Sequence, residues 1–151
     1  MVNIVWQPRN SWRAASMLRR VAEHTLCAEG FEAGWLSVAI VGATAMASLH
    51  QRFRGLRGPT DVLSFDLGTD RRRGIIDGEV VACSDVARQR AGVRNRSFQA
   101  AKAELVLYVI HGILHLTSHD DRTPTAARRM HAREDRLLWE LGIRPVFRAG
   151  A

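Results

Sequence analysis

Residues 104–121, ELVLYVIHGILHLTSHDD, constrain the fold of this chain more than any other stretch. Between Leu105 and Leu116 the apolar residues follow one another too densely for a helix that keeps one face in water. We therefore expect a helix that is buried on most sides and lies near the middle of the fold. The polar pair Thr117-Ser118 is predicted to end this helix and to turn the chain back.

Two histidines, His111 and His115, interrupt the apolar run four positions apart. Residues at this spacing project from one face of a helix, so two imidazoles can bind the same metal ion. A third ligand has to come from the polar residues after the turn. Asp121 stands six residues after His115, the offset of the third ligand in the HExxHxxGxxH motif, and we prefer it. His119 is the better zinc ligand by residue type and remains the alternative.

Three protein ligands and one open position are the arrangement of a catalytic zinc ion rather than of a structural one. We therefore predict one zinc ion per chain, held by His111, His115 and Asp121. In HExxH enzymes the glutamate after the first histidine is the general base, but that position is Gly112 here. A peptidase mechanism of that kind is not predicted.

The segment HGILHLTSHDD resembles the HGxLHLxGxDH signature of the YbeY family, bacterial endoribonucleases of ribosomal RNA maturation that carry a single zinc ion. The chain departs from this signature at two positions. Ser118 stands where the family has glycine, and Asp121 stands where it most often has its third histidine. Because an aspartate can bind zinc through oxygen, we expect the metal site to be retained.

A second signature of the same family, an arginine ahead of PT(D/N)VLSF, matches Arg54 and residues 59–65. The resemblance therefore implies a functional role for Arg54. We predict that Arg54 steadies the charge that develops on phosphorus during RNA cleavage, so that the predicted catalytic residues are Arg54, His111 and His115. The residues 78–81, GEVV, resemble a third family segment, GD(I/V)xI, and the resemblance covers roughly residues 35–142. The family's closing helix pattern is matched by Met130, Glu134, Leu137, Leu138 and Leu141.

The composition favours a polyanionic partner. The chain has 22 Lys and Arg against 15 Asp and Glu, a formal charge of +7, and nearly all the cations are arginines, whose planar fork suits phosphate. Arg71, Arg72 and Arg73 form an exposed basic turn between glycines. Contact with RNA phosphates and a solvated hairpin tip are equally good interpretations of this turn.

A length of 151 residues suits one domain with a single core, which we assign to residues 1–151. The first twenty residues lack the uninterrupted apolar stretch of a secretory signal, and no run reaches the eighteen apolar residues of a membrane span. We therefore expect a cytoplasmic protein that does not enter a membrane.

The remaining patterns predict an α+β fold, with helices on a small mixed sheet of about four strands and the metal-binding helix near the centre. Expected strands cover residues 2–6, 35–41, the VLSF run and 75–83, with the last two paired as a hairpin. The first expected helix is capped by Asn10 or Ser11 and runs to residue 29, and the second covers residues 44–54 with Ala45, Leu49 and Phe53 facing inward. A third, short helix covers residues 85–91, capped by Ser84 and stopped by Gly92. The fourth runs from Ser97 through the two histidines, and the fifth is opened by Thr123-Pro124.

Three functions fit these features. The first, which the family resemblance favours, is a zinc-dependent endoribonuclease that cleaves single-stranded RNA in ribosomal RNA maturation and ribosome quality control, with ribosomal RNA and ribosomal proteins as partners. The second is a metal-dependent hydrolase of a substrate other than RNA. The third is a non-catalytic RNA-binding protein of the ribosome with a structural metal.

Overall fold

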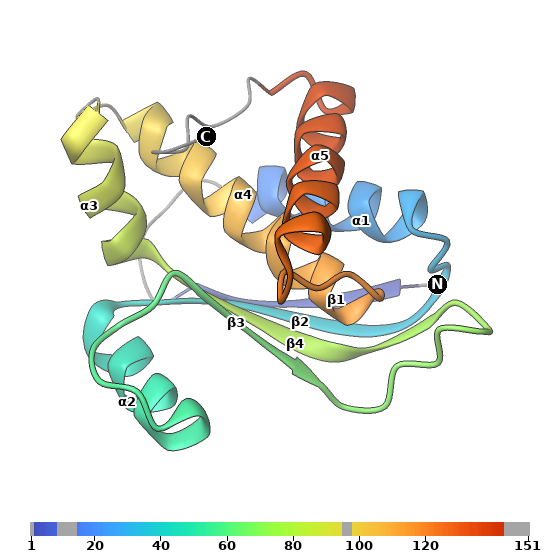
Figure 1. Ribbon diagram of the computed structural model, residues 1–151, viewed down its shortest axis with the longest axis horizontal. Coiled ribbons are helices and arrows are strands. Elements are labelled where there is room, and N and C mark those ends of the chain that lie inside the picture. Colours follow the sequence, from blue (N-terminus) through green and yellow to red (C-terminus); the bar gives the residue numbers. More distant parts are fainter. Residues whose placement is uncertain (1, 9–14, 95–97, 144–151) are drawn as a thin grey trace.

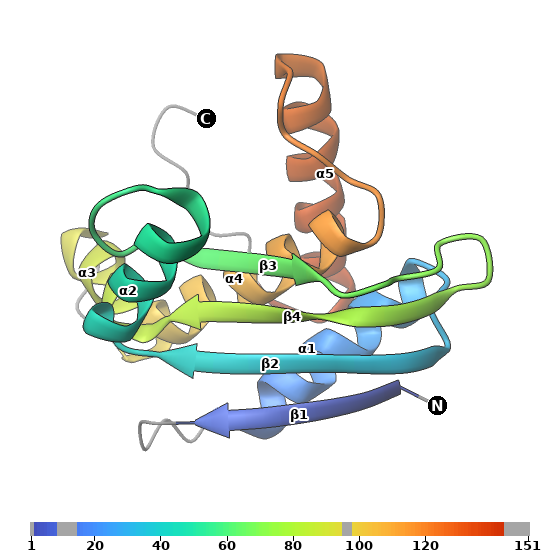
Figure 2. The ribbon, with the colours of Figure 1, turned by 90° about the horizontal axis from the view of Figure 1, so that it is seen from below.

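The computed structural model describes residues 2–8, 15–94 and 98–143. Its four strands form one mixed sheet in the order β1-β2-β4-β3, as Figure 2 shows. β1, β2 and β4 run parallel, and β3 is antiparallel to β4 at one edge. The strands are β1 Val2–Pro8, β2 Ala33–Val41, β3 Val62–Asp66 and β4 Ile75–Cys83. The predicted α+β class, the mixed four-stranded sheet and the β3–β4 hairpin are confirmed.

Helices cover the two faces of this sheet unequally. Figure 1 shows α1, α3, α4 and α5 on one side of the sheet and α2 alone on the other. α5 stands on α4, farther from the sheet. The helices are α1 Ala15–Ala28, α2 Ala43–Arg54, α3 Ser84–Arg94, α4 Phe98–Leu116 and α5 Pro124–Glu140. None of the helices in the described segments is long and apolar enough to span a bilayer.

The central helix α4 is enclosed as its sequence predicts. It packs on β3 and β4 below and on α1, α3 and α5 around it. Residues on every side of it are buried, including Leu105, Val109, Ile113 and Leu114. The exceptions that matter for function are His111 and His115, whose rings are 24% and 32% exposed rather than enclosed in the core.

Two glycines let α4 lie unusually close to the sheet. A Cβ on Gly112 would come within 2.7 Å of a methyl group of Val80 and 3.0 Å of the Ser64 hydroxyl. On the strand side, a Cβ on Gly78 would come within 2.9 Å of Leu116. The Ser64 hydroxyl donates a hydrogen bond of 2.8 Å to the carbonyl of Gly112, so strand and helix are also tied by a polar contact.

The end of α4 is a Schellman motif centred on Ser118. The amide of His119 donates to the carbonyl of Leu114 at 2.9 Å, the bond that closes such a motif. Ser118 has φ 108°, in the region that glycine adopts without strain. The backbone therefore gives a physical reason why glycine suits this position in the family signature.

Several local expectations are wrong and others hold. α3 does not stop at Gly92 but continues to Arg94, because a glycine with helical backbone angles weakens a helix without breaking it. Phe53 is not an inner residue of α2: its side chain is 51% exposed and meets Phe65 edge-on, while Met46 is the buried residue. α5 opens at Thr123-Pro124 as expected, and Thr123 is its N-cap, accepting a hydrogen bond of 3.0 Å from the amide of Ala126. The expected caps of the first helix, Asn10 or Ser11, and the expected start of the central helix, Ser97, lie outside the described residues.

The close approach at Gly112 predicts that Gly112→Ala destabilises the fold by about 1–3 kcal/mol, because the added methyl group overpacks the contact with β3 and β4. Gly92→Ala is the matched control, since Gly92 is also helical but has no atom within 4 Å of its added Cβ. That change should stabilise the fold by up to about 1 kcal/mol. Urea unfolding of both variants measures the two effects, and equal effects would refute the tight packing of Gly112.

The positive φ of Ser118 predicts that Ser118→Gly stabilises the protein by on the order of 1 kcal/mol. The strain relieved is about 1–3 kcal/mol, and the extra freedom of glycine in the unfolded chain offsets about 0.4–1 kcal/mol of it. Ser118→Ala, which removes the hydroxyl but keeps the strain, should not stabilise. Thermal and urea unfolding compare the three proteins; a less stable glycine variant would mean that the backbone at Ser118 is not strained.

Candidate active site

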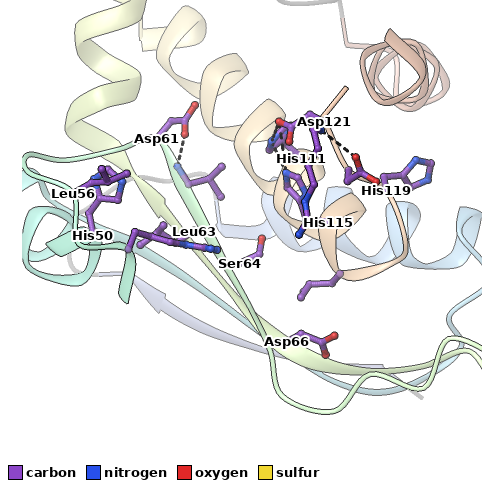
Figure 3. Close-up of a pocket in the computed structure, with 15 residues that line it drawn as sticks. His50, Leu56, Asp61, Leu63, Ser64, Asp66, His111, His115, His119 and Asp121 are labelled. Atoms are coloured by element: carbon purple, nitrogen blue, oxygen red, sulfur yellow. Dashed lines mark hydrogen bonds and ion pairs between the residues drawn. The ribbon is translucent and has the colours of Figure 1, made fainter. Parts of the chain in front are cut away.

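The structure brings His111, His115 and Asp121 together at the C-terminal end of α4. The two Nε2 atoms lie 3.0 Å apart, and an Oδ2 atom of Asp121 lies 3.8 Å from the first and 3.9 Å from the second. Figure 3 shows the two rings on α4 and the carboxylate on the loop that follows. Within the described residues these three form the group of His, Cys, Asp and Glu side chains able to hold a metal ion.

These distances fit a divalent ion. A tetrahedral zinc ion with bonds of about 2.0–2.1 Å keeps its ligand atoms about 3.3 Å apart. The nitrogen pair is slightly closer than this, and the carboxylate oxygen is about half an ångström too far. Asp121 is 46% exposed and sits on a loop, so a small movement of this side chain completes the set.

His119, the alternative third ligand, points elsewhere. Its Nε2 lies 3.0 Å from an oxygen of Glu29, at the end of α1. The other oxygen of Glu29 accepts a bond of 2.6 Å from Arg133 of α5. The loop is thus fixed to α1 and α5 through His119, two residues before Asp121. The side chain grouped with the two histidines is that of Asp121, while its role as a ligand stays a prediction.

A residue to which the sequence reasoning gave no role, Glu134, contacts the site from α5. Its Oε1 lies 2.8 Å from Nδ1 of His111, and the residue is 1% exposed. The signal in the sequence was a carboxylate on the inner, otherwise apolar face of a helix, where a buried charge needs a partner.

The two histidines have opposite pKa shifts. Burial acts to lower the pKa of His111, but the hydrogen bond to Glu134 and the negative charges of Glu134 and Asp121 outweigh it and raise that pKa. Burial and the neighbouring His111 lower the pKa of His115, and Asp121 offsets this only in part. His115 is therefore the ring more readily neutral, the form in which imidazole binds metals.

The group opens into a cleft of about 640 Å³ between α2, β3 and the loop after α4. Arg54, at the end of α2, lines this cleft together with His111, His115 and Asp121. In Figure 3 Ser64 of β3 lies between the metal-binding group and His50 of α2. Arg122 also lines the cleft, a second cation that the sequence reasoning passed over because it belongs to no signature.

The basic turn is not among the residues that line the cleft. Arg71 pairs with Asp66 at 3.1 Å and Arg73 with Asp70 at 3.7 Å, on the connection between β3 and β4. Arg71, Arg72 and Arg73 are all exposed. A role for them in RNA binding stays a prediction and would involve a surface outside the cleft.

Comparison with known proteins assigns this arrangement to a family. The sequence model of the family described as Endoribonuclease YbeY matches residues 6–142. A protein named Endoribonuclease YbeY from Anaeromyxobacter sp. (strain Fw109-5) is 39% identical over 130 residues, which cover 86% of this chain and 66% of that protein. The protein of the same name from Mycobacterium tuberculosis (strain ATCC 25618 / H37Rv) is 37% identical over 114 residues, which cover 70% of this chain and 63% of the relative.

The chain thus spans slightly less than two thirds of the length of these curated relatives. A solved structure, the solution structure of TM1509 from Thermotoga maritima, has the same fold with a TM-score of 0.61 and 25% sequence identity. The match covers 93% of this chain and 91% of that one. From the extent of the family match, which includes every strand and helix that forms the cleft, it follows that this chain belongs to the YbeY family.

Proposed function

We propose that this protein is a zinc-dependent endoribonuclease that cleaves single-stranded RNA during ribosomal RNA maturation and ribosome quality control. The observation that carries the proposal is the shared cleft, in which a metal-binding group and Arg54 face the same space. The relatives named Endoribonuclease YbeY support RNA as the substrate. Ribosomal RNA and ribosomal proteins are the proposed partners, and this substrate implies action in the cytoplasm.

His111, His115 and Asp121 would hold the ion through two nitrogens and one oxygen, leaving a position for water or a substrate oxygen. When bound, zinc supplies a Lewis acid that polarises a phosphoryl oxygen and makes water more acidic. Both rings and the carboxylate remain partly exposed toward the cleft, so a substrate can reach them. This openness favours a catalytic ion over a structural one.

Arg54 would supply the cation that stabilises negative charge on phosphorus. Its guanidinium can donate two parallel hydrogen bonds to phosphate oxygens. Arg54 lies at the end of α2, where Gly55, with φ 67°, ends the helix and turns the chain toward β3. Helix and turn place this arginine beside the cleft without enclosing it.

Gly112 argues against a peptidase of the HExxH type. The residue after the first histidine has no side chain and is packed against β3 and β4, where a glutamate would not fit. The nucleophile is proposed to be water or the ribose 2′-hydroxyl, which forms a bond to phosphorus as an ester P–O bond of the RNA backbone breaks. Its proton passes to solvent rather than to a glutamate at this position, and the leaving oxygen takes a proton from solvent.

For the metal site we predict that the purified protein binds about one zinc ion per chain and that His111→Ala abolishes binding. Asp121→Ala should weaken binding strongly, whereas His119→Ala should keep the stoichiometry. His131→Ala is the control, because His131 is an exposed histidine of α5. Elemental analysis and competition with a chromophoric chelator measure both quantities. Loss of metal in His119→Ala with retention in Asp121→Ala would reverse the ligand assignment.

For Arg54 we predict that Arg54→Ala keeps the fold and metal content but slows RNA cleavage by about a hundredfold or more, the usual effect of losing one such group. Arg54→Lys should restore activity only in part, because lysine keeps the charge and loses the planar fork. Single-turnover cleavage of single-stranded RNA at saturating protein is the measurement. Arg52→Ala is the matched control: Arg52 is exposed in the same helical turn and stacks on Phe53.

Replacing Arg71, Arg72 and Arg73 together separates binding from chemistry. If the turn contacts phosphates, the triple variant should bind RNA more weakly with a lower salt dependence, and bond breaking should change little at saturation.

An Arg54→Ala variant that cleaves at the parental rate would leave the metal as the sole catalytic element. RNA binding that is equal with and without metal, and no cleavage, would support the non-catalytic alternative.

A further inference from the structure

The buried carboxylate of Glu134 is not explained by packing. Glu134 lies on the inner face of α5 beside Met130, Leu137 and Leu138, all of which are fully buried. An apolar side chain would fill this position at no electrostatic cost, whereas a buried carboxylate is costly unless it is paired and hydrogen-bonded. Its contact with His111 at 2.8 Å connects this charge to the metal-binding group.

We propose that Glu134 is the positioning residue of the metal site, fixing the tautomer and the orientation of His111 so that Nε2 faces the ion. This inference rests on the metal site of the proposed function. Glu134 does not touch the ion or the substrate. It acts through its contact with His111 and determines how tightly the ion is held.

The chemistry of the contact determines the tautomer. A carboxylate only accepts hydrogen bonds, so the proton of a neutral His111 must be on Nδ1, the atom 2.8 Å from Glu134. The lone pair is then on Nε2, the atom that points to His115 and Asp121. Without this contact the proton could move to Nε2 and block the ligand atom. The negative charge also makes the imidazole a stronger donor to a cation.

α5 fixes the rest of the site as well. Arg133, next to Glu134 in sequence, binds Glu29, which holds His119 of the loop that carries Asp121. Two successive residues of α5 therefore hold the ligand helix and the ligand loop. Of the two, Glu134 is the one that contacts a ligand side chain, that of His111. Its loss should therefore affect Nε2 of His111, the atom that would bind the ion.

The test compares Glu134→Gln with the parent in the full chain. Glutamine keeps the size of the side chain but removes the charge, and its amide can either accept from or donate to Nδ1. We expect zinc affinity, measured by chelator competition, to fall by about 10- to 100-fold, as for other such partners of metal ligands. Glu104→Gln is the matched control, because Glu104 is also a carboxylate of the core, is 4% exposed and interacts with Tyr108. The control should bind zinc as the parent does.

A second measurement tests the proposal on the parent protein itself. Nitrogen-15 NMR of the metal-free parent, recorded at a pH at which His111 is neutral, should show the proton of His111 on Nδ1. A folded Glu134→Gln variant should in addition show a mixture of tautomers. A parent protein with the proton on Nε2 would overturn the proposal, even if the variant did not fold.

The outcomes also separate this inference from the function on which it rests. If His111→Ala loses zinc and Glu134→Gln binds it within twofold of the parent, Glu134 is a structural residue and the metal site stands. If His111→Ala keeps its zinc, the metal site itself is wrong.

Discussion

The close contact between α4 and the β3–β4 edge of the sheet is the constraint on which the rest of the structure depends. Gly112 and Gly78 remove the side chains that would separate helix and strands, and Ser64 bonds to the helix carbonyl there. A buried helix gains about 1.5–3 kcal/mol from each enclosed large apolar side chain, so its position is strongly determined. The last two turns of α4 also carry His111 and His115, one before and one after Gly112 in the sequence, into the cleft beside β3.

α4 both packs on the sheet and carries the two metal-binding histidines, and Gly112 makes these two roles compatible. His111 and Gly112 are neighbours, and a helix turns by about 100° per residue, so one faces the cleft while the next faces the sheet. A larger residue at position 112 would lift α4 and move both metal-binding rings. Packing and site geometry are therefore not independent here: the residue that permits the contact also sets the height of the ligands above β3.

Local periodicity predicted the parts of the structure that depend on neighbouring residues. Strand 75–83 was located from its apolar run, and the start of α5 from the Thr123-Pro124 pair. The pairing of His111 with His115 followed from helical geometry alone. The failures concern contacts between distant segments. The sequence around Glu134 does not predict its contact with His111, which is 23 positions away. The sequence around His119 does not predict its contact with Glu29 either. Phe53 has the spacing of an inner residue, but α2 is packed at Met46 and leaves its last turn open.

A bound metal ion would also change the balance of charge in the cleft. Although the chain has a formal charge of +7, the cleft lining contains two arginines and four aspartates. Asp61 and Asp66 are paired with arginines that do not line the cleft, Arg90 at 2.9 Å and Arg71 at 3.1 Å.

The charges that then remain in the cleft are Arg54 and Arg122 against Asp120 and Asp121, which balance. A polyanion is attracted to a surface with a net positive potential, and these four side chains by themselves contribute no net charge to the cleft. A bound divalent ion would turn this balance positive beside Arg54. An ion held by Asp121 would thus help to draw the phosphate into the cleft, in addition to acting on it chemically, and RNA binding at this site and metal binding would be one coupled equilibrium.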